Sequence, residues 1–292
     1  MTDRPSLEAR IRAEGLAPMW TRPKMLARPE SICVPRAWRY ELARELLLES
    51  APLVSPQDAE RRVLILENPG LAGRWILSPT LFAGLQLLMP GEVAPPHRHS
   101  QAALRFVLEG AGAFATVGDE RIPLEQGDLV VNPRWDWHAH DHQGNAPVLW
   151  LDVLDVPLVR TFEADFREWA STPVQTQTAS RSVKRFPYAA SRPRVGDSFT
   201  YPMGLPTISA RLDCLRNKTP AYRSTETLLL LVVEGGATLT AGEHCFRLGR
   251  HDFAFVPPWT TYRLEPEGET VAFRASNREA LERLELWREE FL

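Results

Sequence analysis

Cysteine is scarce in this chain of 292 residues, which has only Cys33, Cys214 and Cys245. The three lie far apart and form no CxxC or CxxH pair, so neither a disulfide scaffold nor a cysteine-ligated zinc site is indicated. We expect free thiols that pack in a protein core within a reducing compartment. No apolar run approaches the roughly 18 residues of a membrane span, and the charged N-terminus lacks the apolar region of a signal peptide. These absences predict a cytoplasmic protein without a membrane segment.

An excess of charge is also absent, because 34 Lys and Arg face 37 Asp and Glu, for a net charge of −3. No local run of Lys or Arg suggests a basic face, so we expect no nucleic-acid partner. Hydrophobic residues make up 44% and charged residues 24% of the chain, as in an ordinary folded protein. At roughly 100–200 residues per domain, the length allows two domains.

Short apolar runs divided by Gly and Pro dominate two long segments, which predicts an all-β fold built from sandwiches or barrels. The two segments look like copies, because VLEG at 107–110 aligns with VVEG at 232–235, an offset of 232 − 107 = 125 residues. Helical patterns flank the copies, and a segment rich in Ser, Thr, Pro and Arg joins them. The predicted organisation is an N-terminal helical arm at 1–55, a first barrel at 56–160, a linker at 161–195, a second barrel at 196–275 and a C-terminal helix at 276–292.

Histidine is concentrated in the first barrel, where five of the seven histidines lie between positions 97 and 142. Residues two apart on a strand point to the same face, so His97 and His99 would both enter the barrel, as would His138 and His140. Three neutral imidazoles on adjacent strands can hold one divalent ion and leave positions open, which suits Fe(II) oxygenases. A polar core cluster is the alternative, and we favour a metal site at His97, His99 and His138. His142 follows the expected end of its strand, so we expect it to be exposed.

The order of these residues resembles a known superfamily. Gly-x5-His-x-His, from Gly91 to His99, followed by Gly-x5-Pro and a third histidine, resembles the two motifs of the cupins. More closely, APPHRHSQAALRFVLEG and NPRWDWHAHD resemble the gentisate/salicylate 1,2-dioxygenases, which are bicupin Fe(II) enzymes that open the ring of hydroxybenzoates. Ala103 and Leu104 stand where most cupins place a glutamate ligand, and this family also lacks that carboxylate. The likeness runs from about residue 61 to residue 159 and is weaker in the arm and the second barrel.

The resemblance implies a bicupin with two jelly-roll barrels, one Fe(II) per chain, a small aromatic hydroxy acid and O2 as reactants, and a homotetramer. It also implies substrate contacts. Arg105 lies in an apolar strand with the parity of the histidines, so it either holds a substrate carboxylate, which we favour, or pairs with an acid of the protein. Gln86 shares a strand face with Gly84 and Phe82 and matches a substrate-contacting position, while His140 matches a residue that donates hydrogen bonds or transfers a proton. Further expected contacts are Arg61, or else Arg62, and Trp150 and Asp152, which could instead be ordinary sheet-face residues.

The second barrel carries Tyr222, Ser224 and Tyr262 at the positions of the three histidines, so we expect no metal there. Phe82 and Gly84 stand where many gentisate enzymes have Trp and Ala, a change that resembles the salicylate-type relatives. We therefore predict a ring-cleaving dioxygenase of aromatic degradation that opens a salicylate, 5-substituted as in 5-nitrosalicylate, between the carboxyl- and hydroxyl-bearing carbons. The alternatives are a gentisate 1,2-dioxygenase, a metal cupin enzyme that is not an oxygenase, and a ligand-binding cupin without catalysis.

Overall fold

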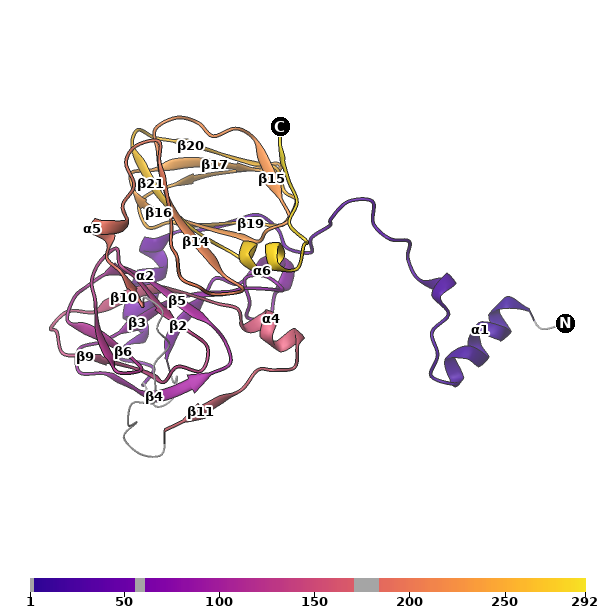
Figure 1. The fold of residues 1–292 in the computed structure, drawn as a ribbon, viewed down its shortest axis with the longest axis horizontal. Helices are drawn as coiled ribbons and strands as arrows, with labels where there is room; N and C mark the ends of the chain where they lie inside the picture. Colours follow the sequence, from indigo (N-terminus) through magenta and orange to yellow (C-terminus); the bar gives the residue numbers. More distant parts are fainter. Residues whose placement is uncertain (1–2, 56–60, 171–183) are drawn as a thin grey trace. The chain divides into compact units, whose positions relative to one another are not determined.

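A computed structural model describes residues 3–55, 61–170 and 184–292, and it divides into two compact units. The unit Met1–Glu30 contains helix α1 (Arg4–Ala13) and the 3-10 helix η1 (Met19–Thr21). The unit Ser31–Leu292 holds all the other elements, including two β-barrels (Figure 1). No helix among the described residues is long and apolar enough to cross a bilayer.

The first barrel is made of two antiparallel sheets. A six-stranded sheet has the order β12-β8-β5-β10-β3-β2, and a five-stranded sheet has the order β11-β4-β9-β6-β7. The strand bounds are β2 (Arg62–Ile65), β3 (Phe82–Leu88), β4 (Val93–His99), β5 (Ala103–Glu109), β6 (Ala113–Val117), β7 (Glu120–Leu124), β8 (Leu129–Asn132), β9 (His138–His142), β10 (Val148–Leu154), β11 (Arg167–Trp169) and β12 (Arg185–Phe186).

The second barrel repeats this arrangement with the sheets β1-β19-β16-β21-β14-β13 and β18-β17-β20-β15-β22. Its strand bounds are β1 (Arg36–Trp38), β13 (Ser198–Thr200), β14 (Ser209–Leu215), β15 (Tyr222–Ser224), β16 (Leu228–Glu234), β17 (Ala237–Ala241), β18 (His244–Leu248), β19 (Phe253–Val256), β20 (Tyr262–Pro266), β21 (Thr270–Ser276) and β22 (Glu289–Phe291). Because β1 pairs with β19, the segment that precedes the first barrel supplies an edge strand to the second. Together the four sheets confirm the predicted all-β bicupin class.

Successive side chains of the six-stranded sheets point to opposite faces. One face packs in a hydrophobic core that the two barrels share, and the other face points into the interior of its own barrel. On β5, Leu104 and Phe106 belong to a hydrophobic cluster that includes residues of both barrels, and the Phe106 ring centroid lies 4.6 Å from that of Phe273. Val107 has the opposite parity and packs in a separate cluster inside the first barrel. Arg105 shares the parity of Val107, so the sheet that joins the two barrels also directs a charged side chain into the interior of the first.

The helices are short and lie outside the sheets. Their bounds are α2 (Tyr40–Ser50), the 3-10 helix η2 (Pro69–Leu71), α4 (Val156–Thr161), α5 (Tyr188–Ser191) and α6 (Arg278–Arg283). The helical pattern predicted to run to residue 292 ends at Arg283, and the chain then forms β22 against β15. The expectation that all three thiols pack in the core is wrong for Cys245, which is exposed, although Cys33 and Cys214 are buried and all three are free.

The segment predicted as a linker contains short strands that complete the first barrel. Strand β11 pairs with β4, and β12 pairs with β8. Strands of two or three residues carry almost no pattern of their own, because most of their stability comes from the neighbouring strand. The pairing of β11 brings this segment beside the strand that holds two of the predicted metal ligands.

Candidate metal centre

Three histidines converge inside the first barrel. His97 and His99 lie on β4 and His138 begins β9, and the pairing of these strands sets His97 directly opposite His138. The ring centroid of His138 lies 4.2 Å from that of His97 and 4.7 Å from that of His99. One ligand nitrogen from each ring lies within 4.8 Å of the other two, and all three side chains are buried. The period of two along a strand therefore brings the three predicted ligands together.

Backbone carbonyls fix the orientation of the three rings. Nδ1 of His97 lies 2.8 Å from the Pro95 carbonyl, Nδ1 of His99 lies 2.9 Å from that of Gln101, and Nδ1 of His138 lies 3.0 Å from that of Asp136. A carbonyl only accepts, so each Nδ1 carries the proton and each Nε2 offers a lone pair. Hydrogen bonds of this kind from the far ring nitrogen hold imidazoles in the orientation that metal binding needs.

The charge state and the hydrogen-bonding state of the rings both suit a divalent ion. Burial, and then the nearby Arg61 guanidinium, lower the pKa of His97 to about 3 and that of His99 to about 4. Burial also holds the pKa of His138 well below its ordinary value, so all three rings are neutral near pH 7. Nε2 of His99 and of His138 are buried and have no hydrogen-bond partner among the described residues. Buried nitrogens of this kind would be costly without a ligand, and an ion would satisfy them.

Arg61 contacts the third ligand nitrogen. One of its Nη atoms makes a very short contact with Nε2 of His97, and because a guanidinium only donates, that nitrogen is the acceptor. His97 can therefore bind an ion through Nε2 only when Arg61 turns aside. Arg62 is placed elsewhere: it is buried, forms an ion pair with Glu92 at 2.5 Å, and donates to the Val54 carbonyl at 2.8 Å. Of the two arginines considered from the sequence, Arg61 lies at the histidines.

Arg105 lies deep in the same interior with two partners. Its Nε is 3.1 Å from Oδ1 of Asp152 on β10, and its Nη1 donates to Oδ1 of Asn132 on β8 at 2.6 Å. The side chains of Arg105 and Asp152 are 1% and 4% exposed. Burial lowers the pKa of Arg105 to about 10, so the guanidinium remains charged near neutrality. The alternative of an acidic partner within the protein is thus realised, and only some of the five N–H donors of Arg105 are engaged by it.

His140 and Gln86 place polar side-chain atoms in the interior of the first barrel. Both ring nitrogens of His140 and Oε1 of Gln86 are buried and lack a hydrogen-bond partner among the described residues. The His140 ring lies 5.6 Å from the ring of Trp150, which stands opposite Gln86 in the pairing of β10 with β3. Burial holds the pKa of His140 well below its ordinary value. Neutral imidazole and amide groups of this kind can exchange hydrogen bonds with a polar ligand.

Gly84 on β3 leaves room for a neighbouring side chain on the strand face that also carries Gln86. It lies opposite Asp152, and a Cβ added to it would stand 2.5 Å from Cγ1 of Val63 and 3.5 Å from Cζ of Phe82. The Val63 side chain on β2 therefore lies next to the position that a methyl group at Gly84 would take. Val63 was not expected from the sequence as a residue of this part of the interior. Any larger residue at Gly84 must move the Val63 side chain and would also crowd the Leu64 carbonyl at 3.2 Å.

Trp169 and His142 differ from the sequence interpretation. Trp169 was not singled out, yet it pairs with His97 across β11 and β4, and its ring lies 5.2 Å from the His97 ring.

The expectation that His142 is exposed is wrong, because β9 continues through it and it is 3% exposed. Its Nε2 lies 2.6 Å from the Ala146 carbonyl and its Nδ1 accepts from the Gly144 amide at 3.0 Å, so it holds the turn that follows β9.

The chain is similar to a known protein family, to characterised dioxygenases and to a solved dioxygenase structure. The family described as "Cupin domain" matches residues 84–154. The gentisate 1,2-dioxygenase 1 of Aquipseudomonas alcaligenes is 35% identical over 98% of this chain and 96% of its own length. The 5-nitrosalicylic acid 1,2-dioxygenase of a Bradyrhizobium species is 35% identical over 32% of this chain and 44% of its own. The crystal structure of a salicylate 1,2-dioxygenase from Pseudaminobacter salicylatoxidans superimposes with a TM-score of 0.92 at 27% identity, over 100% of this chain and 98% of that one.

Proposed function

The chain belongs to the gentisate/salicylate 1,2-dioxygenase family of cupin ring-cleaving dioxygenases, and we propose that it opens a salicylate-type substrate with Fe(II) held by His97, His99 and His138. The observation that carries the proposal is the convergence of three neutral imidazoles, each with Nδ1 held by a carbonyl, beside a buried charged arginine. Among the described residues, no carboxylate joins the three-nitrogen cluster. Such a donor set leaves several coordination positions for other ligands.

Fe(II) held by the three histidines would supply the joint activation of a hydroxy acid and O2. In the overall reaction both oxygen atoms enter the product as the bond between the carboxyl-bearing and hydroxyl-bearing carbons breaks. The chain itself must bind and orient the hydroxy acid and exclude competing water.

We assign the carboxylate of the substrate to Arg105. Its guanidinium is charged, fully buried and held from one side by Asp152 and Asn132, so its remaining N–H groups are pre-organised for an anion. Gln86 and His140 supply hydrogen-bonding atoms that no protein group uses among the described residues, and we assign them to the substrate oxygens and to proton transfer. We also assign Arg61 to the substrate, which it could contact once it leaves His97.

For the substrate we propose a 5-substituted salicylate such as 5-nitrosalicylate. Support comes from Phe82 and Gly84 on the strand face that carries Gln86, and from the partial likeness to the 5-nitrosalicylic acid enzyme. Gentisate is the second candidate, because the relative that matches nearly the whole chain at 35% identity is a gentisate 1,2-dioxygenase.

The test is anaerobic reconstitution with Fe(II), followed by oxygen-electrode and absorbance assays with salicylate, 5-nitrosalicylate and gentisate. We expect the highest kcat/KM with 5-nitrosalicylate and uptake of one O2 per ring opened. A kcat/KM that is highest with gentisate would replace the proposed substrate by the second candidate.

A further inference from the structure

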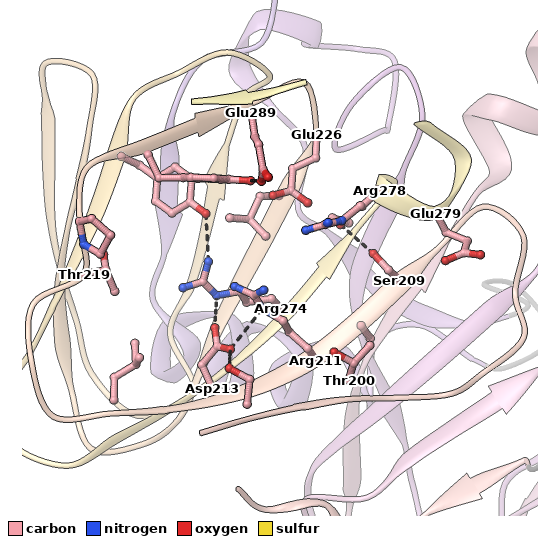
Figure 2. Close-up of a pocket in the computed structure, with 18 of the residues that line it drawn as sticks. Thr200, Ser209, Arg211, Asp213, Thr219, Glu226, Arg274, Arg278, Glu279 and Glu289 are labelled. Atoms are coloured by element: carbon pink, nitrogen blue, oxygen red, sulfur yellow. Dashed lines mark hydrogen bonds and ion pairs between the residues drawn. The ribbon is translucent and has the colours of Figure 1, made fainter. Parts of the chain in front are cut away.

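The second barrel contains a cavity of about 600 Å3, a size typical of small-molecule sites. Its walls come from both sheets of that barrel, with β14, β16 and β21 on one side and β15, β20 and β22 on the other, and helix α6 lies at its edge (Figure 2). None of the residues that line it belongs to the histidine centre of the first barrel. The cavity is therefore a second place where a ligand could be held.

This cavity contains a buried Arg–Asp ion pair, and so does the interior of the first barrel. The strands that carry the two pairs do not correspond. The first pair joins Arg105 on β5 to Asp152 on β10. In the second barrel the register puts Arg274 on β21 opposite Leu230 on β16, so an arginine takes the place of Asp152 and a leucine takes that of Arg105. The acid is now Asp213 on β14, whose Oδ2 lies 2.5 Å from Nε of Arg274. Each barrel therefore holds a buried Arg–Asp ion pair, on different strands, while Tyr222, Ser224 and Tyr262 stand at the histidine positions in the second barrel.

One end of the cavity carries an excess of positive charge, at Arg211 and the more deeply buried Arg274. Arg274 is 8% exposed, and its Nη1 donates to the Tyr262 hydroxyl at 2.9 Å. Nε of Arg211 lies 3.2 Å from the other oxygen of Asp213, so two guanidinium groups share one carboxylate. The Nε atoms of both arginines face Asp213, so a further carboxylate would be bound by their Nη groups. Charged N–H donors held in this way favour a ligand that carries a carboxylate.

The more exposed end carries the opposite charge. Glu289 accepts a hydrogen bond from the Tyr222 hydroxyl at 2.8 Å, and Glu226 accepts one from the Ser224 hydroxyl at 3.2 Å. Among the described residues neither carboxylate forms an ion pair, whereas the nearby Glu279 is neutralised by Arg283 at 2.8 Å. Figure 2 shows Glu226 and Glu289 close together on the side of the cavity that faces the Arg274 guanidinium. The Arg278 guanidinium also lines the cavity near Glu226, but it forms its ion pair with Glu282 at 2.6 Å. Two carboxylates that lack an ion-pair partner of their own favour an ammonium group.

We propose that this cavity binds a small zwitterion, with its carboxylate at Arg211 and Arg274 and its ammonium group at Glu226 and Glu289. A simple anion would meet the two glutamates, and a simple cation would meet the two arginines, so either would be disfavoured by a like charge. The Tyr222 and Tyr262 rings, whose centroids lie 5.7 Å apart, and the Leu228 side chain supply an apolar wall for the body of the ligand. The proposal does not depend on which ring the first barrel opens.

Three probes with the same phenyl ring separate the charge requirements: L-phenylalanine, 3-phenylpropanoate and 2-phenylethylamine. Isothermal titration of the iron-loaded full chain should detect binding of phenylalanine and binding about tenfold weaker or worse for the other two, because each lacks one charge-assisted contact. An absence of binding by phenylalanine, or equal binding by 3-phenylpropanoate, would overturn the proposal.

Matched variants locate the binding. Glu226→Gln removes one charge from a partly exposed side chain without changing its size, and it should weaken phenylalanine binding about tenfold while leaving ring cleavage unchanged. Glu279→Gln changes a glutamate that lines the same cavity but is already paired with Arg283, and it should leave the affinity as it was. Equal effects of the two variants, or none from Glu226→Gln, would show that phenylalanine binds in another way or another place.

Discussion

Replacement of Arg105 by Leu should separate substrate binding from metal binding. Backbone carbonyls hold Nδ1 of each of the three histidines, so the orientation of the rings does not depend on Arg105. We therefore expect normal iron content in Arg105→Leu. Loss of one partner of a buried charge pair with the substrate costs about 2–5 kcal/mol, or about 30- to 5,000-fold in kcat/KM.

The same substitution leaves Asp152 buried without a cation. Removing one partner of a buried ion pair lowers the free energy of unfolding by about 3–5 kcal/mol, so the loss of activity could reflect partial unfolding. The double variant Arg105→Leu/Asp152→Leu replaces both charges by apolar groups, and such replacements are often neutral for stability. It should regain the melting temperature and still lack activity.

Three measurements decide the outcome: iron per chain, melting temperature, and steady-state kinetics at several substrate concentrations. If the double variant folds normally and keeps the kcat/KM of the unmodified chain, Arg105 does not bind the substrate carboxylate. If it binds no iron, Arg105 acts on the metal site and the division of roles proposed here is wrong.

Three further predictions concern the pocket wall, the assembly and the stability of the fold. Gly84→Ala should push Val63 toward the substrate and lower kcat/KM about 5- to 150-fold, more for 5-nitrosalicylate than for gentisate; an unchanged substrate profile would remove Gly84 from the wall. Light scattering should give the mass of a tetramer, because Leu42 and Leu46 on α2 are 57% and 47% exposed and we propose that a neighbouring subunit covers them; a mass near 33 kDa would refute this. Arg62→Met should lower the free energy of unfolding by about 3 kcal/mol in denaturant titration, since it breaks a largely buried ion pair, and an unchanged midpoint would contradict that role.

Much of the metal site could be predicted from the sequence because its ligands obey a short-range rule. His97 and His99 are two apart on one strand, and His138 lies on a strand that a cupin-like order places next to it. The partner of Arg105 could not be selected in this way, because Asp152 comes beside it only when β10 pairs with β5. Long-range pairing of this kind leaves no local pattern.

Two errors of the sequence analysis, at Trp169 and His142, also come from strand pairing that the local sequence does not show. Trp169 was missed because β11 is only three residues long and is stabilised by β4 rather than by its own sequence. His142 follows the end that the sequence predicts for its strand, but its backbone amide donates to the Glu92 carbonyl and its carbonyl accepts from the Gly91 amide. Those bonds extend β9 by pairing it with the residues that precede β4, its neighbour in the sheet, which no property of residues 138–146 alone reveals.

The central claim, that one iron held by the three histidines of the first barrel opens the ring, is tested most directly by titrating the metal-free chain with Fe(II) under anaerobic conditions. Ring cleavage measured after admission of O2 should rise linearly with added iron and level off at one equivalent per chain, and His99→Ala should remain inactive throughout. Saturation at two equivalents per chain, or full activity of His99→Ala, would contradict the account.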